Sequence, residues 1–149
     1  MKKKSKSFVC TNRKARFEYF VEDTFVAGIS LLGHEVRSVR EGKMSISESF
    51  IQINGTNVIL TRATIQPNSA AVHIKYNPTR DRALLLNKNE IMRLNKKINE
   101  KGYTIIPLDV HRKNGLFKLT IGLAKGKNQR DKREDIKKRD MERDLRREI

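Results

Sequence analysis

The large apolar side chains of this 149-residue chain are concentrated in one continuous stretch, residues 17–124, which limits where a core can form. Residues 1–16 contain seven basic residues and no acidic one, and residues 125–149 contain eleven basic and seven acidic residues. Neither end can bury enough apolar surface to offset the entropy that ordering costs. The sequence therefore predicts a partly mobile basic N-terminal arm over 1–16, one compact domain over 17–124, and a basic C-terminal tail over 125–149 that is disordered when free.

The central stretch has mainly the pattern of β-strands. Apolar segments flank two short loops that contain Asn and Gly, at 54–57 and 113–115, and each arrangement predicts a hairpin. Residues 17–21 are rich in aromatic side chains and also predict a strand. Residues 25–39 fit either a helix or a strand, because two glycines interrupt an apolar stripe at helical spacing.

The last segment of the central stretch alternates between large apolar residues and smaller or polar ones. A period of two residues predicts a strand with one buried and one solvent-exposed face. The large residues of its buried face are Phe117, Leu119, Ile121 and Leu123.

One helix is clearly marked after residue 87. Asn87 is a good N-cap, Glu90 completes a capping box, and Gly102 supplies a C-terminal stop. With several short strands and two hairpins, this helix favours a mainly β fold with flanking helices. A small closed β-barrel of the oligonucleotide-binding (OB) type is the natural candidate.

The charge of the chain indicates a polyanionic partner. Lys and Arg total 33 against 17 Asp and Glu, which gives a net charge of +16. Such an excess is self-repulsive unless phosphates neutralise it and release their counterions.

No apolar run is long enough to span a membrane or to form a secretory signal. The single cysteine, Cys10, fits a reducing compartment, so we expect a cytoplasmic protein.

No pattern in the sequence indicates an enzyme. The chain has no Gly-rich phosphate loop with a known spacing, and its three histidines are far apart. One cysteine cannot build a multi-cysteine zinc site. We therefore predict no catalytic residue, no metal site and no cofactor.

Basic side chains on predicted strand surfaces and loops are suited to hold phosphates. Aromatic residues make up only 6% of the chain and Trp is absent, so most rings are expected in the core. This composition favours recognition of the shape and backbone of a folded RNA over stacking on a single strand. Charge alone does not distinguish RNA from DNA. The basic residues predicted to hold phosphates are Arg37, Arg40, Lys43, Arg62, Lys75, Arg80 and Arg82.

Several segments, in order, resemble the SmpB (small protein B) family from about residue 8 to the C-terminus. The matching segments are 12–19, 27–28, 33–43, 45–49, 77–82, 84–90, 122–127 and 131–133. The resemblance implies an OB-type barrel that binds the tRNA-like domain of transfer-messenger RNA (SsrA) and stands in for its missing anticodon arm. It also implies delivery of the alanyl-charged RNA to stalled ribosomes, with elongation factor Tu as an indirect partner through that RNA. A monomer without catalytic activity is expected.

The resemblance also implies two groups of site residues. The first group contacts RNA, and it comprises Arg16, Glu35, Arg37, Arg40, Lys43, Leu85 and Asn87. The second group lies near the decoding centre when the tail enters the empty mRNA channel as a helix, and it comprises Lys127, Arg130, Asp131, Lys132 and Arg133. A carboxylate such as Glu35 can accept hydrogen bonds from base amino groups or 2′-hydroxyls, or it can orient an arginine such as Arg37.

Three positions depart from the family pattern. Phe17 stands where many members have His, Arg130 stands where His or Tyr is frequent, and Met141 replaces an aromatic residue of some members. Two other interpretations compete with this one. A ribosomal or initiation-factor-like RNA protein shares the charge and the barrel but needs no ordered motif set. An RNA-modifying enzyme needs a small-molecule pocket or a cofactor, and the sequence offers neither.

Overall fold

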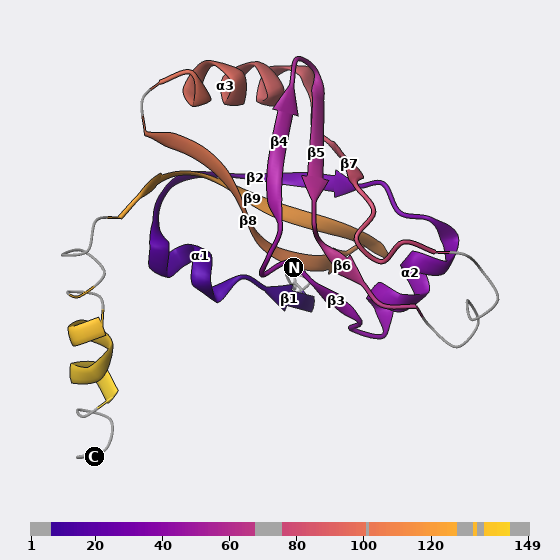
Figure 1. Cartoon of the computed structure of the whole chain (residues 1–149), viewed down its shortest axis with the longest axis horizontal. Helices are drawn as coiled ribbons and strands as arrows, with labels where there is room; N and C mark the ends of the chain where they lie inside the picture. The colour runs from indigo at the N-terminus through magenta and orange to yellow at the C-terminus, as the bar shows by residue number, and fades with distance from the viewer. Residues whose placement is uncertain (1–6, 68–75, 101, 128–132, 134–135, 144–149) are drawn as a thin grey trace, which may run out of the picture.

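The computed structural model describes residues 7–67, 76–100, 102–127, 133 and 136–143 (Figure 1). None of the helices within these residues is both long and apolar enough to cross a membrane. The elements in chain order are β1 (Ser7–Thr11), α1 (Arg13–Glu18), β2 (Tyr19–Ile29), α2 (Gly33–Arg40), β3 (Met44–Ser45), β4 (Phe50–Asn54), β5 (Asn57–Thr61), β6 (Thr64–Ile65), β7 (Arg82–Leu85), α3 (Lys88–Ile98), β8 (Tyr103–Lys113) and β9 (Leu116–Gly126).

A seven-stranded antiparallel sheet forms most of the molecule, in the order β1-β8-β9-β2-β7-β5-β4, and β3 pairs with β6 separately. This mainly β fold with flanking helices is as predicted, but the closed barrel is not confirmed. Strands β1 and β4 are the two edges of the sheet. Some Cα atoms of β4 and β8 come within 8 Å of each other, yet no ladder of hydrogen bonds joins the two strands within the described residues.

Both predicted hairpins are confirmed. Strands β4 and β5 pair up to Asn54 opposite Asn57, and strands β8 and β9 pair up to Lys113 opposite Leu116. At the second turn Asn114 and Gly115 have φ values of 53° and 79°. Asn and Gly tolerate this left-handed conformation, which matches the twist of the flanking strands.

The predicted strand over 17–21 is wrong at its first two residues. Helix α1 continues to Glu18, and β2 begins at Tyr19. The side chain of Asn12 caps this helix by accepting a hydrogen bond from the N–H of Ala15, at 3.3 Å. The ambiguous region 25–39 contains both structures, since β2 ends at Ile29 and α2 starts at Gly33.

The second face of β9 is not solvent-exposed as the alternation predicts. Thr120, Gly122 and Ala124 are all buried, and Ala124 packs with Ala15 of α1. The packing at Gly122 is close: an added Cβ there would lie 3.1 Å from a side-chain carbon of Leu108. The sheet therefore has a second, smaller core under α1, next to the main core inside the curved sheet.

Both ends of the chain contain regular structure within the described residues. Residues 7–16, which composition assigns to the basic arm, form β1 and the first part of α1. The tail departs from the predicted disorder at residues 136–143, which are helical. Every side chain of this segment is exposed, including Ile136 and Met141. The tail helix therefore gains no stabilisation from a buried apolar face.

Candidate nucleic-acid interface

The Glu35 carboxylate lies inside the protein, at the centre of a network of hydrogen bonds. Its side chain is 0% exposed. One oxygen accepts from the N–H of Leu32 at 2.9 Å and from the guanidinium of Arg80. The other accepts from the hydroxyl of Tyr76 at 2.8 Å and from two nitrogens of Arg82, at 2.6 and 3.0 Å. This arrangement leaves no Glu35 oxygen for a nucleic acid in this conformation.

Arg82 is the buried partner of Glu35, with a side chain that is 0% exposed. Its guanidinium also donates to the carbonyl oxygens of Ala63, Pro78 and Arg80. The prediction that Arg82 holds phosphates at the surface is therefore wrong. Of the two roles considered for Glu35, the structure favours orientation of an arginine, but the arginines are Arg80 and Arg82 rather than Arg37. Lys75 lies outside the described residues.

The network fixes the charge of Glu35. Burial alone raises the pKa of its carboxyl group, because it disfavours the charged form. Hydrogen bonds from Arg80, the Leu32 N–H, Tyr76 and Arg82 outweigh burial and lower this pKa from 4.5 to about 2. Burial and then the Glu35 carboxylate raise the pKa of Tyr76 to about 12, so its hydroxyl stays protonated and can donate.

This pKa predicts loss of stability in acid. Because the folded-state pKa of Glu35 lies below its ordinary value of 4.5, its contribution is complete above about pH 5 and declines as pH falls toward 2. We expect the free energy of unfolding, measured in urea from pH 6 to pH 3, to fall less steeply in Glu35→Gln than in the wild type. Glu48→Gln removes an exposed carboxylate and serves as the control. Parallel pH dependences in the wild type and Glu35→Gln would contradict the assignment.

The opposite face of α2 carries the predicted basic residues. Arg37, Arg40 and Lys43 are all exposed at the end of this helix and just after it. Glu41 lies 3.9 Å from Arg37 and 3.3 Å from Lys43, and it compensates part of their charge. Such exposed pairs contribute little to stability and can exchange a carboxylate for a phosphate. The buried face of α2 thus anchors the helix, while the outer face presents its cations.

Leu85 and Asn87 lie at the end of β7 and the start of α3. The Leu85 side chain is 63% exposed, beside Gly28 of the neighbouring strand. The Asn87 side chain accepts from the N–H of Glu90 at 2.9 Å, and the Glu90 carboxylate accepts from the Asn87 N–H at 3.2 Å. The predicted capping box is confirmed. Asn87 therefore has a structural role whether or not it contacts RNA.

The buried ion pair connects these two groups of predicted residues. Glu35 belongs to α2, whereas Arg82 is the first residue of β7, which ends at Leu85. Along β7 Arg82 and Leu84 point inward while Ala83 and Leu85 point outward. The bond between Glu35 and Arg82 therefore holds the cationic helix and the exposed Leu85 in fixed relative positions.

Arg16 lies apart from this region. It belongs to α1, and α1 and α2 lie at opposite ends of the molecule in Figure 1. Its backbone carbonyl accepts a hydrogen bond from the Lys127 ammonium at 3.2 Å. The Lys127 N–H donates to the Glu18 carbonyl at 2.8 Å, and its ammonium lies 4.8 Å from the ring of Phe20. The structure thus brings the backbone of Arg16 together with Lys127, the first of the predicted site residues in the tail.

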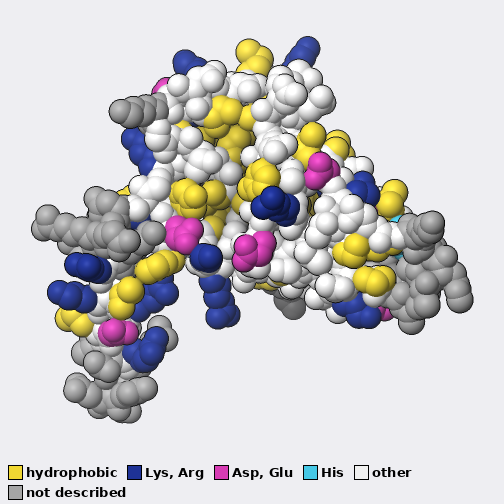
Figure 2. Space-filling view, viewed as in Figure 1, with side chains coloured by type: hydrophobic (Ala, Val, Ile, Leu, Met, Phe, Trp, Pro, Cys, Tyr) yellow, Lys and Arg dark blue, Asp and Glu magenta, His cyan; other side chains and the backbone are white. Residues whose placement is uncertain are grey.

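The tail helix carries exposed basic side chains interspersed with apolar and acidic ones (Figure 2). The Arg139 guanidinium lies 5.3 Å from the ring of Phe17, the residue that departs from the family pattern. Arg133 is helical and exposed. Arg130, Asp131 and Lys132 lie outside the described residues.

Sequence reasoning missed Tyr76 and the partners of Glu35. The available signal was the 77–82 motif, but nothing in the sequence pairs its arginines with residue 35. Within the described residues, no three His, Cys, Asp or Glu side chains come together to hold a metal ion.

Comparisons with known proteins agree with the predicted resemblance. A family model described as SmpB protein matches residues 9–149. The chain belongs to the SmpB family. The SsrA-binding protein of Psychrobacter cryohalolentis is 48% identical over 146 residues, which are 97% of this chain and 92% of that protein. The SsrA-binding protein of Leuconostoc mesenteroides is 45% identical over 144 residues, covering 97% and 94% of the two chains.

A solved structure supports the same family assignment. A chain in "tmRNA-SmpB: a journey to the center of the bacterial ribosome" matches with a TM-score of 0.66 and 36% sequence identity. The match covers 85% of this SmpB-family chain and 93% of the other.

Proposed function

We propose that this chain binds the tRNA-like domain of transfer-messenger RNA and takes part in trans-translation, the rescue of stalled ribosomes. Relatives at 45–48% identity are SsrA-binding proteins, and the matching solved structure is of tmRNA with SmpB. The protein acts in the cytoplasm as a monomer, without catalysing a covalent step. Elongation factor Tu is an indirect partner, through the charged RNA.

The observation that carries the proposal is the anchored surface formed by α2 and β7. Arg37, Arg40 and Lys43 supply phosphate-binding cations, and Leu85 with Asn87 supplies a neutral patch at a fixed distance from them. A rigid pattern of cations with a neutral patch suits the shape and backbone of a folded RNA. Glu35 then acts as a positioning residue, since it holds α2 against β7 from inside.

The tail has a separate proposed role. The part of the predicted tail that follows β9 and Lys127, residues 128–149, enters the empty mRNA channel as a helix. Lys127 at its base, with Arg130, Asp131, Lys132 and Arg133, lies near the decoding centre. The exposure of every side chain from 136 to 143 supports this role, because such a helix has all its sides available to a surrounding channel. The body over 17–124 binds RNA, and the arm over 1–16 adds positive charge.

Binding to the isolated tRNA-like domain, in the presence of excess total tRNA and near-physiological salt, tests the proposal. A protein of charge +16 binds almost any RNA at low salt, so only binding that survives competition indicates shape recognition. We expect retention of the complex. Complete displacement by tRNA would favour a general basic RNA protein of the ribosomal type.

Substitution of the cations at the end of α2 and just after it should lower the affinity for this RNA. It should also make the affinity less dependent on salt. Each phosphate contact removed lowers the slope of log K against log salt concentration by about 0.7–0.9. We therefore expect Arg40→Gln and Lys43→Gln each to show such a reduction, measured by fluorescence anisotropy across a salt series. Lys113→Gln removes an equal charge from the β8–β9 hairpin and should leave the slope unchanged. The same reduction in Lys113→Gln would mean that the loss reflects net charge alone.

A further inference from the structure

Gly28 lies between an exposed leucine and a lysine in one cross-strand row of the sheet. The register places Leu85 of β7 opposite Gly28 on one side and Lys118 of β9 opposite it on the other. Residues paired in this way point to the same face of a sheet. Because Leu85 points outward, all three residues belong to the outer face, and they form the Gly28 row. Its two ends are two strand spacings apart, or about 9–10 Å.

Neither a turn nor a bulge requires glycine at position 28. The register between β2 and β9 shifts only between Val21 and Asp23, and Gly28 is not among the glycines with positive φ. A glycine in a paired strand costs about 0.5–1 kcal/mol relative to alanine, and it often marks a close approach of another group. That group is the Leu85 side chain, since an added Cβ would lie 3.3 Å from its Cβ and 3.5 Å from its Cδ1. Leu85 thus leans over Gly28, where a larger residue would displace it.

Lys118 supplies a positive charge on the other side of Gly28. Among the described residues it takes part in none of the ion pairs shorter than 4.0 Å. Its side chain is half-buried, so its aliphatic part lies along the sheet while the ammonium reaches the surface. A lysine placed in this way has a restricted position and an uncompensated charge, which suits it to hold a phosphate.

We propose that the RNA surface formed by α2 and β7 extends across the Gly28 row. Leu85 contacts the sugar of one nucleotide of the tRNA-like domain, and Lys118 binds a phosphate of the same RNA segment. Gly28 is a positioning residue, because it determines where the Leu85 side chain lies. This inference rests on the proposed function and adds to it one phosphate ligand and one positioning residue.

The Gly28 row recognises the RNA backbone without base stacking. Phe8, Phe20 and Phe50 are 58%, 50% and 37% exposed, so the expected core placement is wrong for these three rings. The register pairs none of them with a residue of the Gly28 row. Arg62 is exposed as well, but it lies beside Phe50, with its guanidinium 5.7 Å from the centre of that ring. The row therefore offers an apolar contact and a cation, which fit a sugar and a phosphate.

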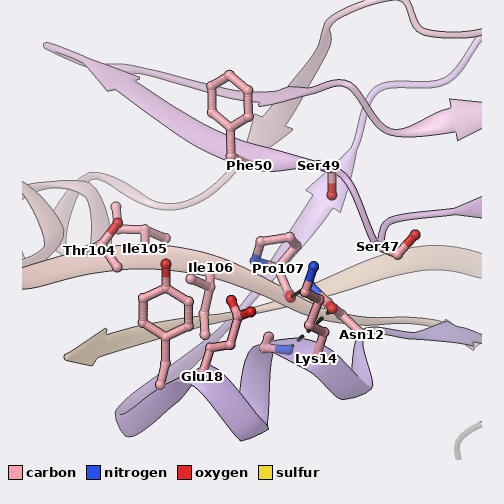
Figure 3. Close-up of a pocket in the computed structure, with 12 residues that line it drawn as sticks. Asn12, Lys14, Glu18, Ser47, Ser49, Phe50, Thr104, Ile105, Ile106 and Pro107 are labelled. Carbon is pink, nitrogen blue, oxygen red and sulfur yellow. Dashed lines mark hydrogen bonds between the residues drawn. The ribbon is translucent and has the colours of Figure 1, made fainter. Parts of the chain in front are cut away.

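A separate pocket provides a control position. This pocket, of about 180 Å³, lies between α1, β8 and the segment that joins β3 to β4 (Figure 3). Lys14 and Glu18 line it from α1, and no residue of the Gly28 row does so. Lys14 is exposed, so Lys14→Gln removes the same charge as Lys118→Gln at a site outside the proposed surface.

Lys118→Gln tests the phosphate ligand. We expect lower affinity for the tRNA-like domain, with a slope of log K against log salt concentration reduced by about 0.7–0.9, the effect of one lost phosphate contact. Fluorescence anisotropy of the full chain across a salt series, with excess total tRNA, measures both quantities. Lys118→Arg keeps the charge and should keep the slope, and Lys14→Gln should match the wild type. An unchanged slope in Lys118→Gln, or an equal reduction in Lys14→Gln, would overturn the assignment of Lys118.

Gly28→Ala tests the positioning role through its dependence on Leu85. The substitution should lower affinity by at least about twofold, because residues in contact are coupled to this extent or more. In a Leu85→Ala background the same change should have no further effect, since no leucine side chain remains to be displaced. Equal losses in the two backgrounds would show that Gly28 acts independently of Leu85. The melting temperature of each variant reports on folding separately from binding.

The wild-type result separates this inference from the proposed function. Complete displacement of the wild type from the tRNA-like domain by tRNA would contradict the proposed function. Retention of the wild-type complex, together with wild-type binding by Lys118→Gln and Gly28→Ala, would leave the proposed function standing and overturn only the extension across the Gly28 row.

Discussion

Replacement of Glu35 by glutamine is expected to lower the free energy of unfolding by about 3–5 kcal/mol, the usual cost of breaking a buried ion pair from one side. The neutral side chain keeps the size of the original but leaves the Arg82 guanidinium buried at 0% exposure without a counter-charge. Tertiary stability of small domains is only about 5–15 kcal/mol, so this single change removes a large fraction. Urea unfolding at pH 7, followed by circular dichroism, measures the loss.

The matched control is Glu41→Gln, on the exposed side of the same helix. Glu41 pairs with Arg37 and Lys43 at the surface, and loss of such pairs costs about 0–1 kcal/mol. RNA affinity at a temperature where Glu35→Gln remains folded should still fall, because α2 and β7 lose their common anchor. A Glu35→Gln protein as stable as Glu41→Gln would show that the network does not anchor α2.

Glu35 also illustrates how far the sequence could predict the site. Its position in a family motif identifies it as a site residue, with a carboxylate suited to accept from RNA or to orient an arginine. Its burial was not predictable, because its partners Tyr76, Arg80 and Arg82 are 41 to 47 residues away in sequence. Single-sequence patterns record local spacing, whereas this network depends on the pairing of β7 with β2 and β5.

The same distinction holds for the fold. The two hairpins and α3 were predicted because turn residues and a capping box act within a few positions of each other. Helix α1 was missed, since six residues give no periodic signal and its position depends on a cap at Asn12 and on packing against β8 and β9. The burial of Ala124 reflects that missed helix, because Ala124 packs with Ala15.

The structure separates a folded body, which ends next to α1, from the C-terminal tail. Strand β9 ends at Gly126, and Lys127 is still held by the Glu18 carbonyl, so the separable tail starts at residue 128. Residues 128–149 contain nine basic and seven acidic residues, a net charge of +2 out of the total of +16. The tail is therefore charged throughout but contributes little to the net attraction between the protein and RNA.

Deletion of residues 128–149 should consequently abolish tagging on stalled ribosomes and leave affinity for the tRNA-like domain within about threefold at physiological salt. The expected loss of tagging has a geometric reason. The tail helix lies apart from the sheet and its flanking helices, and no other described segment does so (Figure 1). A reconstituted translation system with a truncated mRNA measures tagging, and anisotropy measures RNA binding.

A tail of identical composition in scrambled order separates sequence from charge. If the tail acts through particular residues near the decoding centre, the scrambled protein should bind RNA normally and fail in tagging, as the deletion does. Tagging restored by the scrambled tail would mean that charge and length suffice. Equal loss of RNA binding and tagging in the deletion would instead place the tail within the RNA site, because an element of net charge +2 cannot reduce affinity that far through long-range attraction alone.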